Sequence, residues 1–254
     1  MLFKANKIEK NKKKEKPHHM EQKAFEEEEI IEDDVIPEII AASEPHMALL
    51  FLLDTSGSMK QNGAIGQLNA GLNRFKMEVC ENKQTKEILD VAIVEFNTKH
   101  AVIQEFVPVE YIKPVELTAR GGTVMSPAID TALEMVTERS KFYRRAGTEP
   151  YKPWVMLVSD GAPSDNIDDA AKKIKDMEDA GKLSFRSLGV GDFDSKVLHK
   201  LSGQKVMKLT DGTDFTDFFD WVNKSMRSVS QSSPGERPKA EKLSGNVVVD
   251  TDWD

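Results

Sequence analysis

The fold is decided by the stretch MALLFLLDTSGSM, residues 47–59. Residues 47–53 are apolar without interruption, which is typical of a strand that is buried on both faces of a parallel sheet. The apolar run ends at Asp54, and the small residues Thr-Ser-Gly-Ser follow it. Open α/β sheets place their ligand sites at the carboxyl ends of strands. The stretch therefore predicts a core strand that carries oxygen-bearing side chains to a binding site.

The spacing of Asp54, Ser56 and Ser58 can bring three oxygen groups together. With Gly57 at the bend of a tight turn, the carboxylate and both hydroxyls can converge on one point. Magnesium prefers octahedral oxygen coordination, so these three groups are too few to hold it. Other parts of the chain must supply the remaining ligands.

Two later stretches can supply them. Thr123 follows two flexible glycines, and a second apolar run, 154–159, ends in an acid at Asp160. Together, the stretches DTSGSM, GGT and VSDG resemble the metal-ion-dependent adhesion site of von Willebrand factor A (VWA) domains. The resemblance extends over about residues 46–232. It implies that a divalent cation is bound by the hydroxyls of Ser56, Ser58 and Thr123, while Asp54 and Asp160 act directly or through water.

A narrower resemblance points to one group within that family. The loop SDGAPSD, residues 159–165, and the segment FFDWVNKSMRSVS, residues 218–230, are similar to bacterial VWA proteins associated with tellurium resistance and chemical stress. This resemblance implies a role in a bacterial stress response.

The charges of these residues indicate what the site binds. The carboxylates of Asp54 and Asp160 balance a divalent cation, whereas the three hydroxyls add no charge. If both acids act mainly through water, the metal keeps an open, electrophilic position, which favours a Glu or Asp of a partner protein. We therefore expect a metal-dependent protein-binding module and not an enzyme, with Mg²⁺ as the cofactor and Mn²⁺ or Ca²⁺ as alternatives.

A magnesium-dependent, phosphatase-like hydrolase that uses Asp54 is the alternative function. Asp54 at the end of a first strand is similar to the aspartyl nucleophile of haloacid-dehalogenase-type phosphatases, but Ser56 stands where that family has its second acid. A serine hydrolase is disfavoured as well. Neither Ser56 nor Ser58 lies in a G-x-S-x-G pattern, and the five histidines form no catalytic pattern.

The composition excludes some other classes. The chain has 254 residues and a formal net charge of −8, which disfavours a general nucleic-acid binder. It has no apolar run long enough to span a membrane, and its start, MLFKANKIEKNKKKEK, lacks the apolar core of a secretory signal. We expect a cytoplasmic protein that binds neither membrane nor nucleic acid; the sequence leaves its oligomeric state open. Cys80, the only cysteine, is expected to be a small core residue.

Three segments are expected. Residues 1–43 combine lysine-rich and acidic blocks, which predicts a disordered or conditionally helical arm, with docking on a partner or on this domain as the alternative. Residues 44–232 form the VWA domain. Residues 233–254 form a linker and an acidic tail, although the valines at 247–249 could instead add a strand to a sheet edge. Either acidic tail could also fill the open metal position in cis.

The predicted fold class is α/β, with a doubly wound, mainly parallel sheet and helices on both faces. The VWA resemblance implies a Rossmann-like sheet of six strands in the order 3-2-1-4-5-6, with one antiparallel edge strand. In this order the strands that end at Asp54 and Asp160 are neighbours where the winding reverses. The expected strands are 47–53, 88–96, 100–106, 154–159, 183–190 and 205–209.

Helices are predicted between these strands from apolar residues spaced three and four apart. The first helix carries its stripe from Ile65 to Val79, and the last carries one from Phe215 to Met226. Ser126 followed by Pro127 predicts a helix start capped by the serine hydroxyl. Asp165 and Asp168 are expected to cap the helix that follows them.

Overall fold

The structure, a computed structural model, describes residues 44–160, 162–210, 213–234 and 240–251. The predicted arm, residues 1–43, lies outside the described residues, as do Asp252 and Asp254 of the predicted acidic tail. Within the described ranges, strands and helices alternate along the chain from residue 47 to residue 249.

The strands form one sheet in the order β3-β2-β1-β4-β5-β6-β7. Its five inner strands are parallel, whereas β3 and β7 run antiparallel at the two edges. The predicted doubly wound α/β fold and its strand order are confirmed, with one strand more than expected. The strands are β1 (Met47–Asp54), β2 (Leu89–Phe96), β3 (His100–Pro108), β4 (Trp154–Ser159), β5 (Ser184–Gly189), β6 (Val206–Leu209) and β7 (Val247–Val249).

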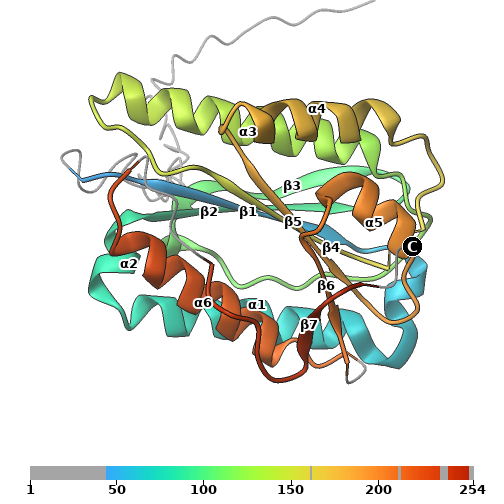
Figure 1. The fold of residues 1–254 in the computed structure, drawn as a ribbon. Coiled ribbons are helices and arrows are strands. Elements are labelled where there is room, and N and C mark those ends of the chain that lie inside the picture. Colours follow the sequence, from blue (N-terminus) through green and yellow to red (C-terminus); the bar gives the residue numbers. More distant parts are fainter. Residues whose placement is uncertain (1–43, 161, 211–212, 235–239, 252–254) are drawn as a thin grey trace, which may run out of the picture. The chain divides into compact units, whose positions relative to one another are not determined.

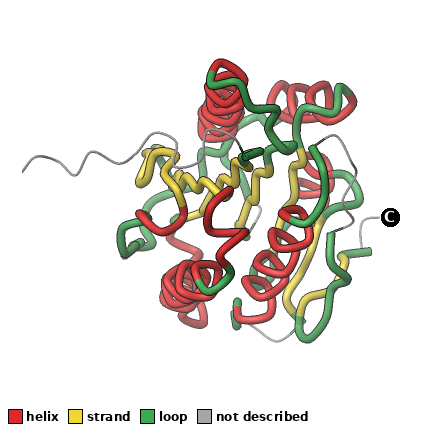
Figure 2. Tube along the Cα trace, turned by 90° about the vertical axis from the view of Figure 1, so that its left-hand side faces the viewer, coloured by secondary structure: helices red, strands yellow, loops and turns green. Residues whose placement is uncertain are grey.

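Helices cover both faces of the sheet, with α1, α2 and α6 on one face and α3, α4 and α5 on the other (Figure 1). Figure 2, turned by 90°, shows the strands between two groups of helices. In the described part of the chain, no helix combines the length and the apolar character needed to cross a membrane. The helices are η1 (Gly57–Gly63), α1 (Ala64–Cys80), α2 (Lys83–Ile88), η2 (Val109–Tyr111), α3 (Ser126–Arg145), α4 (Asp168–Asp179), α5 (Ser195–Ser202) and α6 (Thr216–Ser230).

The central strand β1 explains why its sequence is apolar throughout. Leu49, Phe51 and Leu53 point into the core under α1 and α6, whereas Leu50 and Leu52 point into the core under α3 and α4. Successive side chains of a strand face opposite sides, so a strand with helices on both sides needs apolar residues at every position. All eight residues of β1 are buried.

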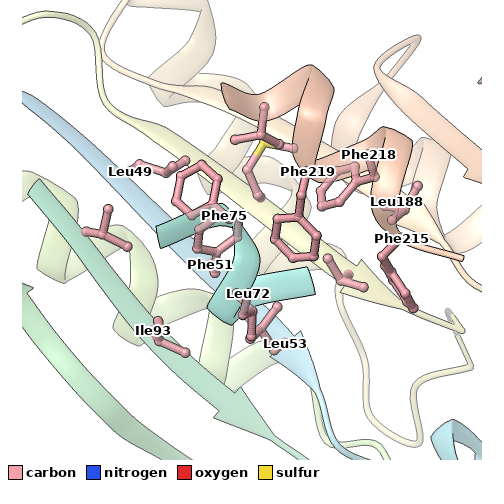
Figure 3. Packing of buried hydrophobic residues seen from close by; sticks show 14 of the residues in the cluster. Leu49, Phe51, Leu53, Leu72, Phe75, Ile93, Leu188, Phe215, Phe218 and Phe219 are labelled. Carbon is pink, nitrogen blue, oxygen red and sulfur yellow. The ribbon is translucent and has the colours of Figure 1, made fainter. Parts of the chain in front are cut away.

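On the α1 and α6 side, aromatic rings fill the core (Figure 3). The ring of Phe51 lies 5.3 Å from that of Phe75 in an edge-to-face arrangement and 5.8 Å from that of Phe219. Gly71 of α1 allows this close approach, because a Cβ atom at this position would lie 2.4 Å from the Phe219 ring. Cys80 is half-buried at the edge of this core, as expected for a small packing residue.

The carboxyl-terminal end of α3 is fixed to the amino end of β2 by a buried polar cluster. Asp90 accepts hydrogen bonds from the Tyr143 hydroxyl (2.5 Å) and from Nη2 of Arg139 (2.8 Å). The His46 ring stacks on Tyr143 with 5.3 Å between centroids. Burial raises the pKa of Tyr143 well above its usual value, so this phenol stays a hydrogen-bond donor to Asp90.

The prediction of a solvated C-terminal tail is wrong for residues 247–249, which form β7 against β6. The alternative, a strand added to the sheet edge, is what the structure contains. Asp250, directly after β7, is buried. It accepts a hydrogen bond from Ser195 (2.5 Å) and forms an ion pair with Lys208 (2.9 Å), and its Oδ2 lies 3.1 Å from Nε2 of His199. His199 is a buried residue of α5 that contacts this segment.

Candidate metal centre

The sheet order places the two predicted acids at neighbouring strand ends. β1 pairs with β4 in parallel, with Leu53 opposite Val158, so Asp54 and Asp160 follow strands that end side by side. The loops after these strands and the loop before α3 are joined by main-chain hydrogen bonds. Gly57 donates to the Gly121 carbonyl (3.0 Å), and Ser164 donates to the Thr123 carbonyl (2.7 Å). The three predicted stretches thus form one loop cluster.

The two serine hydroxyls meet, as their spacing predicted. Oγ of Ser56 lies 2.9 Å from Oγ of Ser58, with Ser56 buried and Ser58 exposed. The turn that brings them together continues into η1, and the main-chain N–H of Met59 donates to the Ser56 carbonyl (3.2 Å). Two neutral oxygen donors therefore lie side by side where the loop reaches solvent.

Asp54 is fully buried, and its carboxylate holds the loop in place. Its Oδ1 accepts from the main-chain N–H of Ser56 (2.7 Å), and its Oδ2 accepts from the Ser159 hydroxyl at the end of β4 (2.6 Å). Burial raises the pKa of the Asp54 carboxyl to about 6, although hydrogen bonds from Ser159 and Ser56 oppose the rise, and the nearby charge of Asp160 adds to it. The carboxylate of Asp54 thus interacts with both the main chain and the side chain of Ser56.

Thr123 and Asp160 complete the set of predicted site residues. Thr123 is buried in the loop that leads into α3, and Asp160 is half-buried directly after β4. In the described ranges, no hydrogen bond joins either side chain to Ser56 or Ser58. The Oδ1 atom of Asp160 is buried and, within the same ranges, receives no hydrogen bond.

The start of α3, which positions Thr123, is capped differently from the prediction. The Ser126 hydroxyl makes no capping bond. Instead, the carboxylate of Asp165 accepts from the main-chain N–H groups of Met125 (2.9 Å) and Ser126 (2.8 Å). The prediction that Asp165 caps its own following helix is therefore wrong: a carboxylate takes two free amides at the end of another helix, where it also meets the positive end of the helix dipole.

The predicted cap at Asp168 is also wrong. Its own main-chain N–H donates to the side chain of Asn166 (2.8 Å), and its carboxylate pairs with Lys200 on the surface. Asn166 therefore satisfies the first amide of α4, while Asp165 binds the start of α3.

Gly121 is required by the local geometry of the loop cluster. Its φ angle is +70°, and a Cβ atom there would lie 2.4 Å from Oγ1 of Thr98. Thr98 also accepts a hydrogen bond from the main-chain N–H of Gly122 (2.8 Å). Gly121 thus allows the loop to pass close to the β2–β3 hairpin and to reach Gly57.

Two supporting residues were missed from the sequence. Ser159 donates to Asp54, and Asn97 donates to the Thr55 hydroxyl (2.9 Å) within the loop after β1. The available signal was positional: Ser159 is the last residue of an otherwise apolar strand, and Asn97 directly follows β2.

The donor set is chemically suited to a divalent cation. Among the described residues, no group of three or more His, Cys, Asp or Glu side chains could hold a metal, so a site here depends on hydroxyls. The buried Oδ1 of Asp160 lacks a donor, and an orphaned carboxylate oxygen in such a place is costly unless something positive satisfies it. Carboxylate and hydroxyl oxygens are the hard ligands that Mg²⁺ and Mn²⁺ prefer.

Comparison with known proteins identifies the family. Residues 48–221 match the von Willebrand factor type A domain. The chain belongs to the VWA family. No curated protein matches its sequence significantly.

Solved structures share the fold of this VWA domain at low sequence identity. The pilus adhesin SpaC of Lactobacillus rhamnosus GG is 12% identical, with a TM-score of 0.58 over 74% of this chain and 31% of that chain. A von Willebrand factor type A protein from Catenulispora acidiphila is 16% identical, with a TM-score of 0.56 over 72% of this chain and 43% of that chain. The VWA chain thus spans less than half the length of either relative.

A third similar structure contains a metal. The manganese-loaded TRAP protein of Plasmodium vivax is 15% identical, with a TM-score of 0.50 over 70% of this chain and 73% of that chain. At these identities the similarity concerns the fold.

Proposed function

We propose that this VWA domain binds a partner protein through a divalent cation held by Asp54, Ser56, Ser58, Thr123 and Asp160. The observation that carries the proposal is the buried Oδ1 of Asp160, which has no donor among the described residues and lies in the same loop cluster as the paired hydroxyls of Ser56 and Ser58. VWA domains are commonly metal-dependent interaction modules, and the manganese-loaded TRAP structure is an example of a metal in this fold.

Four of these residues would be ligands of the cation, and the fifth, Asp54, stabilises the loop. Ser56, Ser58 and Thr123 would hold the cation with neutral oxygens, and Asp160 would add one negative charge. Asp54 keeps the loop folded, since both its oxygens already accept hydrogen bonds. When bound, Mg²⁺ or Mn²⁺ would supply a positive centre that is incompletely neutralised and attracts a Glu or Asp of the partner.

The geometry argues against the hydrolase alternative. An aspartyl nucleophile needs a carboxylate oxygen that can reach the substrate. Asp54 is completely buried, and its two oxygens are hydrogen-bonded to Ser56 and Ser159. A binding role, without catalysis, is therefore the better account of this site.

The cellular role that we propose is in a bacterial response to tellurite or related chemical stress. Its support is the resemblance of the loop at residues 159–165 and of the segment at residues 218–230 to tellurium-resistance-associated VWA proteins. Deletion of the gene in the source organism should increase tellurite sensitivity. Complementation by the wild-type protein but not by Asp54→Ala would link that role to the metal site, and unchanged sensitivity would contradict the stress assignment.

The metal site itself is tested by calorimetry. We expect the purified full chain to bind one Mg²⁺ or Mn²⁺, and the double variant Ser56→Ala/Ser58→Ala to lose this binding while its circular dichroism and melting temperature stay close to wild type. Ser228→Ala on α6, away from the loop cluster, is the matched control and should bind metal normally. Equal affinity in the double variant would refute the assignment.

A further inference from the structure

The rim of the candidate metal centre is basic on one side. Lys60, Lys99 and Arg120 are exposed and lie in segments bound to the loop after β1. The main-chain N–H of Arg120 donates to the Thr55 carbonyl (2.7 Å), between Asp54 and Ser56. Lys99 follows Asn97 and Thr98 in the β2–β3 hairpin, and Lys60 lies two residues after Ser58. The whole chain has a net charge of −8, so these three exposed cations give the loop a local charge opposite in sign to that of the chain.

Arg120 is the most firmly placed of the three cations. Its Nη2 donates to Oε1 of Glu95 (3.1 Å), whose side chain is only 10% exposed, whereas the Arg120 side chain is 61% exposed. Glu95 lies near the end of β2, so a rigid strand holds one edge of the guanidinium. In the described residues this is the only side-chain hydrogen bond of Arg120, and its other N–H donors face solvent. A guanidinium with free, oriented donors is suited to a second carboxylate.

The opposite side of the rim is acidic. Asp192 and Asp194 are exposed in the loop after β5, and the main-chain N–H of Asp194 donates to the Asp160 carbonyl (2.9 Å). The charge on the rim therefore changes sign from the β2 side of the centre to the β5 side. A partner carboxylate beside the metal is attracted toward Arg120 and repelled from Asp192.

We infer that Arg120 is a specificity residue that selects partners with two acidic groups, one for the metal and a second for the guanidinium, with Lys99 and Lys60 adding attraction. This inference rests on the proposed metal-dependent binding function. It also specifies how the partner is oriented on the site. The second acid of the partner lies on the β2 side of the metal-binding acid, and the partner surface toward Asp192 and Asp194 is neutral or basic.

The experiment uses short capped peptides and the full chain loaded with Mg²⁺. One alanine-based peptide carries a single Asp, and a series carries two Asp residues from adjacent to four positions apart. Affinities are measured by NMR titration, with and without EDTA. We expect the best two-acid peptide to bind about two- to fivefold more tightly than the single-acid peptide, the range of one exposed ion pair.

Variants separate the role of Arg120 from a structural one. Arg120→Glu should remove the advantage of the two-acid peptide but retain metal-dependent binding of the single-acid peptide, and Arg120→Lys should keep part of the advantage. Lys141→Glu, at the far end of α3, is the matched charge-reversal control and should leave the advantage unchanged. Melting temperatures check that all variants are folded.

Two failures can be told apart. If the single-acid peptide binds in Mg²⁺ and is released by EDTA, but two acids bring no advantage or Arg120→Glu preserves it, the inference about Arg120 is overturned and the proposed function stands. If no peptide shows metal-dependent binding, the proposed function is overturned, and this inference with it.

Discussion

The buried position of the Asp54 carboxylate lowers the stability of the metal-free fold. It is completely buried, and burial raises the pKa of its carboxyl from 3.8 to about 6, so the ionised form is disfavoured when no cation is present. Its hydrogen bonds to Ser56 and Ser159 offset only part of this cost. A buried carboxylate that is kept at such a cost is typical of a functional position.

We therefore expect Asp54→Asn to stabilise the metal-free protein and to weaken Mg²⁺ binding, because the substitution removes a negative charge close to the proposed cation. The pKa shift from 3.8 to about 6 limits the gain in the free energy of unfolding to about 3 kcal/mol, and a gain of about 1–2 kcal/mol is expected at neutral pH because Asn changes the hydrogen bonds. The folded pKa lies above the unfolded value, so the wild-type carboxyl favours folding at about pH 4 and loses that contribution as the pH rises through about 6.

Urea unfolding in EDTA at several pH values measures this effect. The difference between Asp54→Asn and wild type should increase from about pH 4 to about pH 7. Asp169→Asn, an exposed position on α4, is the control and should differ little from wild type at either pH. A variant less stable than wild type at neutral pH would contradict the prediction.

Helix α1 lies against α6 at a distance set by Gly71. The Phe219 ring occupies the space that a side chain at this position would need, and this ring also packs on Phe51. Gly66, in the same helix, is exposed, and a Cβ atom there would meet nothing within 4 Å beyond the backbone of its own helix. Gly71 is thus in close contact with a neighbouring helix, whereas Gly66 faces open space.

The substitution Gly71→Ala should lower the free energy of unfolding by about 1–3 kcal/mol, because the new methyl group forces Phe219 or the whole of α6 to move. Gly66→Ala is the matched control and should raise it by up to about 1 kcal/mol, since alanine is the better helix former. Chemical denaturation of both variants gives the two values. Equal effects at both positions would show that the α1–α6 contact is looser than described.

The amino end of α3 depends on Asp165, which lies in another loop. Asp165→Ala removes the acceptor of two main-chain amides and should lower the free energy of unfolding by about 1–2 kcal/mol. Metal affinity should fall as well, because Thr123 lies just before this helix end. Asp168→Ala is the control and should have little effect, because its pair with Lys200 is exposed to solvent. If both alanine variants behave alike, Asp165 does not cap α3.

Much of the molecule could be predicted from sequence because the signals are local or periodic. The uninterrupted apolar runs at 47–53 and 154–159 identify central parallel strands, and their alternation with helices predicts a mainly parallel sheet. The strand order was implied by the VWA resemblance. Short elements without a period, such as α2, gave no such signal. Three valines are equally compatible with a tail and a strand, since β7 is defined only by its pairing with β6.

The candidate site likewise contains contacts that could be predicted from sequence and contacts that could not. The VWA resemblance predicts which side chains form the site, and the contact between Ser56 and Ser58 follows from their two-residue separation. The capping role of Asp165 and the contact of Asp54 with Ser159 link residues that are 40 and 105 positions apart. Such contacts depend on how the finished loops pack, so a single sequence does not specify them.

The C-terminal segment closes one edge of the whole domain, and Asp250 fixes it. Asp250→Ala leaves His199 and Lys208 without their carboxylate partner and should lower the free energy of unfolding by about 2–4 kcal/mol, because breaking a buried charged network is costly. The exposed neighbour provides the control, Thr251→Ala, which should be neutral. Hydrogen exchange should show faster exchange in β6 and β7 of the aspartate variant. Unchanged protection would mean that strand pairing alone holds this edge.

Both ends of α3 are anchored, by Asp165 at its start and by Asp90 near its finish. Hydrogen bonds therefore hold the helix at both ends, and a translation of the helix along the sheet would break both sets of bonds. Any movement of Thr123 toward a ligand must therefore come from the loop ahead of the helix. Spin labels on α3 and β1 should accordingly keep one fixed separation, whether or not Mg²⁺ is added.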